Sequence, residues 1–407
     1  MEWIIENQEL LVYISIPLTC SFVGWITNLI ALKMTFYPLT FWGIPPFLGW
    51  QGIIPRKAVK MATKSVDMLT TKLIKVEEIF ERVDPETVSD EISEPLEEIS
   101  SQIVNDIGES TNHQVWSLTP QPIKDGIYSQ VKGEVKPLVS TLMTDIKRNI
   151  IKLFDLKKLV IQNLTGNNVT NLVDMFQRCG SAEFKFIEMA GLYFGFLFGL
   201  LQVGVWAFYN EPWTLPVIGV IVGYITNWLA LQMIFRPHYE TSYLGIKYQG
   251  LFLKRQKEVS KEYSALVAQR ILNARNINEE ILYGTAADEI FKMIQNQITS
   301  TLNKIEGFTK PLVNLILGTS EYNAIRKYVV GKITDHVPKS MALAEEYMDK
   351  AMNLEDTIYS RLSELPPEEF EELLRTAFQE DEIILIMVGA ALGCLIGLAQ
   401  MFVVMSL

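Results

Sequence analysis

The side chains that could support chemistry are few in this sequence and widely separated. Its three histidines and three cysteines show neither the spacing of metal ligands nor a disulfide framework. These residues are His113, His238, His336, Cys20, Cys179 and Cys394. The carboxylate pairs Asp90-Glu91 and Asp288-Glu289 could act in general acid–base catalysis, although such pairs are common on exposed helix faces. The sequence contains no nucleotide-binding, serine-hydrolase or zinc-protease motif, so we expect no catalytic residues, no cofactor and no metal.

A polar Thr-Asn pair stands inside each of two nearly identical apolar strings. Thr27-Asn28 lies in GWITNLIALKMTFYP, and Thr226-Asn227 lies in GYITNWLALQMIFRP. An amide inside a membrane must find a protein partner, because no water is available there. One interpretation is a clamp in which Asn28 and Asn227 bond to each other, and the other is a polar site for an ion or solute. The sequence favours the clamp, because it places no charged residue at this depth.

Two series of glycines recur at four-residue spacing in two other apolar segments. This spacing puts the glycines on one face of a helix, where two backbones can approach closely. The series are Gly191, Gly195 and Gly199, followed by Gln202, and Gly389, Gly393 and Gly397, followed by Gln400. We expect both faces to be helix-packing surfaces, either within one chain or between two chains.

Four apolar segments are long enough to cross a bilayer, which requires about 20 residues. They are residues 10–35, 185–208, 214–235 and 383–405. Residues 209–213 suffice for a tight hairpin, whereas residues 39–184 and 238–382 are charged and belong in water. The chain of 407 residues has a net charge of −11, which argues against nucleic acid as a partner.

Basic residues mark the side of the membrane on which the two polar regions lie. The termini and the hairpin contain no Lys or Arg, whereas both polar regions carry them next to the spans. The positive-inside rule therefore places both polar regions in the cytoplasm and the termini outside. The basic residues closest to the membrane include Arg56, Lys57, Lys60, Arg236, Lys254, Arg255 and Lys257. They act either as topological signals with an interfacial anchor or as a paired site for anionic lipid head groups.

The chain is a tandem duplication of one unit. Gly24 corresponds to Gly223, 199 residues later, and Gln51 corresponds to Gln249, 198 residues later, with the second offset kept to the end. A constant register over this length predicts two repeats, each a span, a helical region and a span. The repeats are residues 1–208 and 214–407. Two spans in each repeat give both the same orientation, so we expect a pseudo-two-fold axis along the membrane normal.

Both polar regions show the apolar periodicity of amphipathic helices. Ile92, Leu96, Ile99, Ile103 and Ile107 recur at intervals of three and four residues. A longer stripe follows, formed by Ile127, Val131, Val135, Leu138, Leu142, Ile146 and Ile150. A stripe this narrow and long needs a partner helix, and the natural candidate is the equivalent stripe of the other repeat, from Ile325 to Leu362. No segment sustains the alternation of a β-strand, so the predicted fold class is an all-α membrane protein. The paired helices form either extended arms or a compact bundle.

The string GxITNxxAxxMxFxP, the later QGxxxxR/K segment and the terminal GxxxGxxxGLxQ span together resemble the YheB-like family of bacterial membrane proteins. The resemblance covers nearly the whole chain in both repeats. It implies a multi-pass protein of the bacterial cell membrane and brings no catalytic residues. One departure is that Arg236 has Tyr37 as its counterpart, which argues against a role that needs Arg in both copies.

These features predict an integral membrane protein that is not an enzyme. The leading interpretation is a scaffold or membrane-organising protein with paired cytoplasmic arms, whose partners are membrane lipids and proteins bound through the cytoplasmic helices. The alternative is a transport-class protein that moves or shields lipid or another apolar solute along a groove between the arms. Arms that bury each other's apolar stripe leave no groove, whereas an open apolar trough would favour lipid.

The orientation can be tested by thiol labelling of whole cells that express variants lacking the native cysteines. A reagent that cannot cross the membrane should modify Asn210→Cys but not Ser129→Cys, because the positive-inside rule places residue 210 outside. Solubilised membranes are the control, since both positions are then accessible. The opposite labelling pattern would refute the predicted topology.

Overall fold

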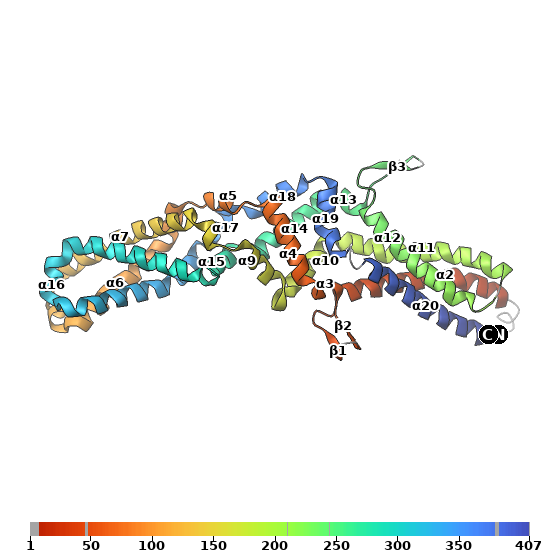
Figure 1. The fold of residues 1–407 in the computed structure, drawn as a ribbon, viewed down its shortest axis with the longest axis horizontal. Helices are drawn as coiled ribbons and strands as arrows, with labels where there is room; N and C mark the ends of the chain where they lie inside the picture. The colour runs from red at the N-terminus through yellow and green to blue at the C-terminus, as the bar shows by residue number, and fades with distance from the viewer. Residues whose placement is uncertain (1–7, 45–47, 210, 244, 379–381, 407) are drawn as a thin grey trace. The chain divides into compact units, whose positions relative to one another are not determined.

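The structure is a computed structural model that describes residues 8–44, 48–209, 211–243, 245–378 and 382–406, and these residues are mostly helical (Figure 1). Four helices are long and apolar enough to cross a membrane, and they contain Tyr13–Phe36, Ser181–Phe208, Thr214–Phe235 and Glu382–Phe402. The predicted all-α membrane fold is thereby confirmed. Asn210, in the predicted hairpin 209–213, lies outside the described residues.

The elements recur in nearly the same order in the two repeats. The first repeat contains α2 (Gln8–Phe36), β1 (Trp42–Ile44), β2 (Leu48–Trp50), α3 (Ile53–Arg56), α4 (Ala58–Met68), a π-helical turn (Leu69–Leu73), α5 (Val76–Glu81), α6 (Pro85–Leu118), α7 (Gln121–Arg148), α8 (Ile150–Leu153), α9 (Leu156–Leu164), a 3-10 turn (Gly166–Asn168), α10 (Val169–Cys179) and α11 (Ser181–Phe208). The second contains α12 (Thr214–Phe235), β3 (Thr241–Tyr243), β4 (Ile246–Tyr248), α13 (Leu251–Lys254), α14 (Gln256–Leu266), a π-helical turn (Val267–Ile271), α15 (Ala274–Tyr283), α16 (Ala287–Met341), a 3-10 turn (Ala342–Ala344), α17 (Glu345–Met352), α18 (Leu354–Ser363), α19 (Pro367–Phe378) and α20 (Glu382–Ser406). The two π-helical turns occupy equivalent positions, so the duplication extends to local irregularities.

A short antiparallel β-hairpin follows the first span of each repeat. In the first hairpin β1 pairs with β2, and in the second hairpin β3 pairs with β4. The sequence predicts no strand, and the difference has a simple reason. Strands of three residues are too short to display the alternation of apolar and polar residues by which a strand is recognised.

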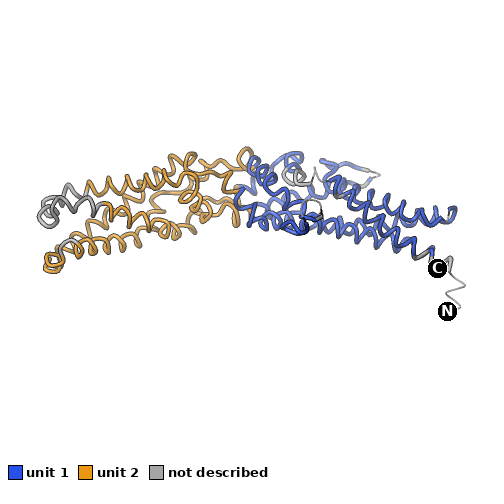
Figure 2. Tube along the Cα trace, turned by 60° about the horizontal axis from the view of Figure 1, so that its bottom comes forward, with its two compact units in different colours: residues 1–68, 161–266, 358–407 blue, residues 69–160, 267–357 orange. Residues whose placement is uncertain are grey.

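The chain divides into two compact units, and each unit draws on both repeats (Figure 2). Unit 1 contains residues 1–68, 161–266 and 358–407, and unit 2 contains residues 69–160 and 267–357. The repeats are therefore units of duplication, whereas the units of packing combine equivalent parts of both. In each repeat the chain enters unit 2 at the π-helical turn.

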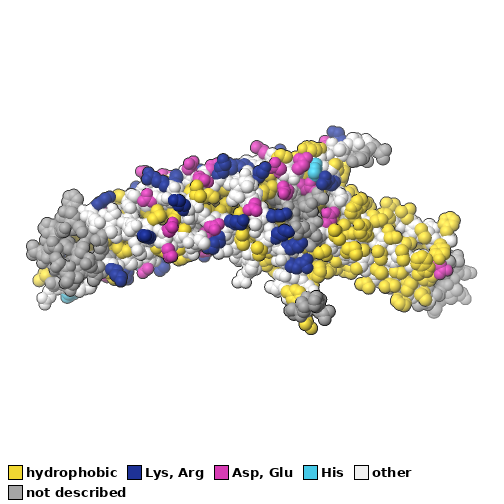
Figure 3. Space-filling model, in the orientation of Figure 1, with side chains coloured by type: hydrophobic (Ala, Val, Ile, Leu, Met, Phe, Trp, Pro, Cys, Tyr) yellow, Lys and Arg dark blue, Asp and Glu magenta, His cyan; other side chains and the backbone are white. Residues whose placement is uncertain are grey.

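In unit 1 the four span helices form a bundle. Each repeat contributes one closely packed pair, α2 with α11 and α12 with α20, and the pairs meet through α11 with α12 and α2 with α20. Ile16, Cys20, Trp206 and Leu215 form a buried cluster between the pairs. Hydrophobic side chains cover the visible face of the span helices, as Figure 3 shows. An exposed apolar surface of this extent is typical of contact with lipid.

The repeats interlock in the part of unit 1 next to the spans. Helix α10 of the first repeat packs against α14 of the second as well as α3 of its own. Helix α19 of the second repeat packs against α4 of the first and α13 of its own. The exchange is reciprocal, as expected for two equivalent copies.

Unit 2 is a helical bundle in which the apolar stripes of both repeats share one core. Ile92 and Ile103 on α6 are 3% and 4% exposed, and Ile290 on α16 is fully buried. A small cavity, partly open to solvent, lies among α6, α7, α15 and α16. Both Ile290 and Met341, from opposite ends of α16, line it. A straight helix of 55 residues would be about 80 Å long, so the chain reverses direction between these two residues.

Candidate functional site: the helix seams and the membrane edge

The first seam, defined as the contact between α2 and α11, brings two backbones together. A Cβ atom on Gly191 would lie 2.2 Å from the carbonyl oxygen of Gly24, so a larger residue forces the helices apart. Cβ atoms on Gly195 and Gly199 would lie 2.5 and 2.6 Å from backbone atoms of α2. The whole glycine face of α11 is therefore in contact with α2.

Asn28 closes the first seam with a hydrogen bond between the helices. Its side chain is fully buried, and its Nδ2 donates to the backbone carbonyl of Ile187 at 2.7 Å. The hydroxyl of Ser21 adds a second bond, to the carbonyl of Leu192 at 2.8 Å. The Oδ1 of Asn28 has no hydrogen-bond partner among the described residues. Side-chain bonds between membrane helices average about 0.6 kcal/mol, so these two secure the seam without dominating its stability.

The second seam, between α12 and α20, repeats this geometry with equivalent residues. A Cβ atom on Gly389 would lie 2.1 Å from Nδ2 of Asn227 and 2.8 Å from the carbonyl oxygen of Gly223. Cβ atoms on Gly393 and Gly397 would lie 2.2 and 2.6 Å from backbone atoms of α12. The sequence left open whether the glycine faces pack within one chain or between two chains. In this structure both faces pack within one chain.

Asn28 and Asn227 were expected to bond to each other, but each contacts the second span of its own repeat. Asn28 bonds to α11, and Asn227 lies against Gly389 of α20. The hydroxyls of Thr27 and Thr226 donate to carbonyls of their own helices, at 3.0 and 2.8 Å. The glycines are the physical reason, because a helix face without side chains brings backbone carbonyls within reach of the amide.

The residues of α2 and α12 that face the glycines also recur at a regular spacing. They are Pro17, Cys20, Gly24 and Asn28 in α2, and Pro216, Gly219, Gly223 and Asn227 in α12. Intervals of three, four and four residues place each set on one helix face. Together with the glycine series, this pattern would have predicted pairing of the two spans within each repeat.

Gln202 and Gln400 occupy equivalent positions but have different partners. The Sγ of Cys20 donates to Oε1 of Gln202 at 2.9 Å within the first seam. The Nε2 of Gln400 donates to Oγ1 of Thr19 at 3.1 Å, which joins α20 to α2. The glutamine of the second repeat thus links the repeats, whereas that of the first stabilises its own seam.

Arg255 joins the two repeats at one end of the span helices. Its Nη1 bonds both carboxylate oxygens of Glu183 at 2.9 Å, and its Nε bonds Glu258 at 2.8 Å. The side chain of Glu183 is 4% exposed and that of Arg255 is 28% exposed. Burial acts to lower the pKa of Arg255, but the hydrogen bonds to Glu258 and Glu183 outweigh it and raise the pKa. Arg255 is therefore a structural residue rather than an open site for lipid.

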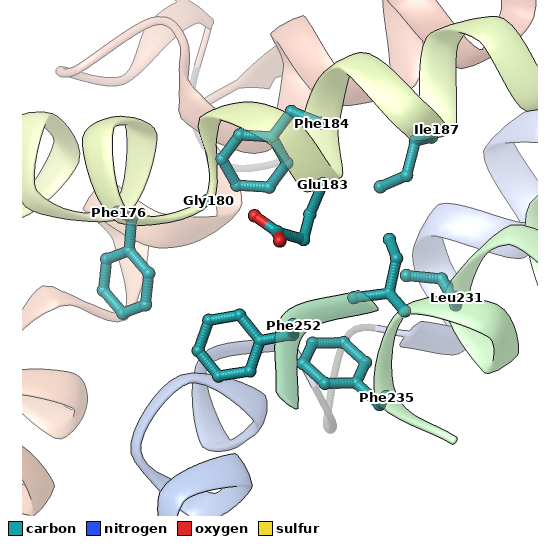
Figure 4. A pocket seen from close by; sticks show the side chains of 9 residues that line it. Phe176, Gly180, Glu183, Phe184, Ile187, Leu231, Phe235 and Phe252 are labelled. Carbon is teal, nitrogen blue, oxygen red and sulfur yellow. The ribbon is translucent and has the colours of Figure 1, made fainter. Parts of the chain in front are cut away.

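A small apolar cavity, partly open to solvent, adjoins this ion pair. Figure 4 shows the carboxylate of Glu183 pointing into the space between Phe176, Phe184 and Phe252. Helices of both repeats line the cavity, and Glu183 is the one charged side chain among its described lining residues. Since Arg255 holds that carboxylate, the arrangement is typical of packing rather than of catalysis.

The other basic residues predicted to contact lipid lie on the surface of unit 1. All except the half-buried Lys57 are exposed, namely Arg56, Lys60, Arg236, Lys254 and Lys257. Their exposure makes contact with lipid head groups testable, and Arg255 is held by its two carboxylate partners.

Two further groups of titratable residues lie near the spans, in the described part of unit 1. Burial, with a smaller contribution from Glu262 and Glu183, raises the pKa of Cys179 to about 12, so its thiol stays protonated and unreactive. His238 contacts Glu371 through Nε2 and lies with Nδ1 3.6 Å from Glu368. The described residues contain no group of three side chains that could hold a metal.

Comparison with known proteins points to bacterial membrane proteins. A UPF0754 membrane protein of Shouchella clausii is 34% identical over 112 residues, which cover 26% of this chain and 29% of that protein. One of Bacillus velezensis is 25% identical over 160 residues, covering 33% and 42%. One of Staphylococcus aureus is 25% identical over 206 residues, covering 46% and 52%. The chain thus spans between 29% and 52% of the length of these relatives.

No family model and no solved structure matches the chain. The names of the relatives support a bacterial membrane protein and state no enzymatic activity. The YheB-like label stays a prediction, because these names do not carry it.

The close approach at the first seam predicts unequal effects of two glycine substitutions on α11. Gly191→Ala should lower the free energy of unfolding by about 1–3 kcal/mol, the usual cost of forcing extra volume into a packed interface. Gly204→Ala is the matched control, because nothing lies within 4 Å of its added Cβ. Unfolding of the full chain in detergent measures both, and equal losses would contradict the assigned seam.

The buried ion pair predicts a larger energetic coupling than an exposed pair in the same unit. Glu183→Gln should cost about 2 kcal/mol, because Arg255 loses a charged hydrogen-bond partner. In a double-mutant cycle, Glu183→Gln and Arg255→Met should be strongly non-additive. Glu240→Gln is the control, since the Lys247–Glu240 side chains are 75% and 56% exposed, and should cost less than about 1 kcal/mol. Additive effects of the first two substitutions would refute the coupling.

Proposed function

We propose that this chain is a non-enzymatic scaffold of the bacterial cell membrane. Unit 1 anchors the chain through the four span helices, and unit 2 lies in the cytoplasm as a helical arm that holds partner proteins on its polar faces. The basic residues next to the spans support this orientation. The relatives support the membrane location.

The observation that carries the proposal is the mutual burial of the apolar stripes in unit 2. Val135 and Ile146 of the stripe on α7 are each 7% exposed, and Ile290 on α16, the counterpart of Ile92, is fully buried. Because the stripes of both repeats are engaged in packing, the polar faces are left for contacts with other molecules. A helical bundle with a packed core and a polar surface is suited to holding partners at a membrane.

A second candidate function is the transport or shielding of an apolar solute. The cavity of unit 2 favours it, because the described lining is apolar apart from Asn278 and Ser340. The amide nitrogen and oxygen of Asn278 have no hydrogen-bond partner among the described residues. The cavity occupies one part of the bundle, however, so a solute could move along unit 2 only if the packed stripes separated.

Site-specific photocrosslinking in cells distinguishes the two functions. A small diazirine amino acid is introduced at Leu118, which is 82% exposed in unit 2, and at Leu142, which lines the cavity. The scaffold predicts discrete protein adducts from position 118 and no lipid adducts from position 142. Leu201 on α11 is the control for lipid detection, because it is 62% exposed on a span helix and should yield lipid adducts.

Each of the two positions in unit 2 can contradict the scaffold. Lipid adducts from position 142 would support transport and overturn the scaffold. A lack of protein adducts from position 118, with the control at 201 positive, would also count against it.

A further inference from the structure

The first hairpin exposes large apolar side chains directly after a membrane span. Trp42 is 78% exposed and Ile44 is 70% exposed, both on β1. Helix α2 ends at Phe36, so β1 begins within a few residues of the end of the span. Water is an unfavourable environment for these side chains, whereas the head-group region of a bilayer accommodates Trp well.

Hydrogen bonds fix the first hairpin to the end of α2. The Nε1 of Trp50 on β2 donates to the carbonyl of Met34 at 3.1 Å, and the Nε2 of Gln51 donates to the carbonyl of Leu39 at 2.8 Å. The ring of Phe41 covers Gly49 so closely that a Cβ there would lie 2.3 Å from a ring carbon. The exposed side chains are thus held next to the end of the span rather than on a loose loop.

Exposed basic residues lie on the segment that follows the hairpin. Arg56 on α3 and Lys60 and Lys64 on α4 are exposed, and Val59 beside them is 61% exposed. Figure 3 shows Lys and Arg side chains gathered over α4, next to the hydrophobic surface of the span helices. Basic charge beside exposed apolar side chains at the end of a span is complementary to a bilayer that carries anionic lipid.

The second hairpin differs from the first at the equivalent positions. Thr241 and Ser242 stand where the first hairpin has Trp42 and Gly43. Lys247 on β4 forms an ion pair with Glu240 at 3.8 Å. The segment before β3 is turned toward α19, because the hydroxyl of Tyr239 donates to Glu368 at 3.1 Å. Among the described side chains of β3 and β4, the exposed ones are the polar Ser242 and Lys247, which are suited to water.

We propose that β1 and β2, together with Arg56, Lys60 and Lys64, form a membrane-interface site that binds anionic lipid. The apolar side chains of β1 enter the head-group region of the same bilayer that the spans cross, and the three basic side chains contact the phosphates of anionic lipids. The second hairpin stays in water. The two copies of the duplicated unit therefore differ in how they meet the membrane surface.

Fluorescence quenching tests the insertion in the full chain reconstituted into nanodiscs. The variants Ile44→Cys and Ser242→Cys, each without the native cysteines, are labelled with an environment-sensitive dye. A lipid with a spin label near its head group should quench the dye at position 44 several-fold more strongly than the dye at position 242. Equal quenching at both positions, or none at 44, would overturn the proposal.

Lipid composition tests the basic part of the site. With the dye at position 44, adding phosphatidylglycerol to phosphatidylcholine nanodiscs should increase quenching, and raised salt should reverse the increase. The combined variant Arg56→Gln, Lys60→Gln and Lys64→Gln should lose this dependence, whereas Lys247→Gln should keep it. A combined variant that still responds to phosphatidylglycerol would refute the assignment of these three residues. Unchanged thermal unfolding confirms that each variant is folded.

Discussion

The close approach of helix backbones at the two seams is the constraint on which the span bundle depends. In a bilayer the lipid chains are as apolar as the helices, so helices associate through dispersion contacts and hydrogen bonds rather than through the hydrophobic effect. Gly191 against Gly24 provides the contact area, and the same approach brings the carbonyl of Ile187 to Asn28. Without the glycines the amide would be left unpaired in hydrocarbon, which is costly. The helix packing and the hydrogen bond of the buried amide therefore depend on the same glycines.

The seams explain how two copies of one unit assemble. Each copy pairs its own spans, because the complementary small faces lie on α2 and α11 in one copy and on α12 and α20 in the other. Contacts between copies use other groups, such as Gln400 with Thr19 and Arg255 with Glu183. A buried ion pair contributes little net stability, but it penalises every arrangement that leaves one of its charges without a partner. The pair at Arg255 thus favours one alignment of the two copies.

The two hairpins are equivalent elements of the two repeats, but their exposed side chains differ. The hairpins have the same antiparallel pairing, yet β1 exposes Trp42 and Ile44, whereas the second hairpin carries the Lys247–Glu240 ion pair. In unit 2 the stripes of both copies remain buried in one core, because each is the other's partner. At the exposed hairpins a changed side chain does not remove a packing contact from the other copy, so the two hairpins could diverge.

The amino-acid sequence by itself determined the helical class, the four spans and the duplication, because composition, periodicity and a constant register carry this information locally. It also marked the glycine series and the Thr-Asn pairs, since small and polar residues stand out in apolar segments. The tertiary structure alone decided their partners. Asn28 bonds to a carbonyl 159 residues away, and Arg255 to a carboxylate 72 residues away. Such choices depend on which backbones approach each other in space, and a single contact between distant residues leaves no periodic signal in the chain.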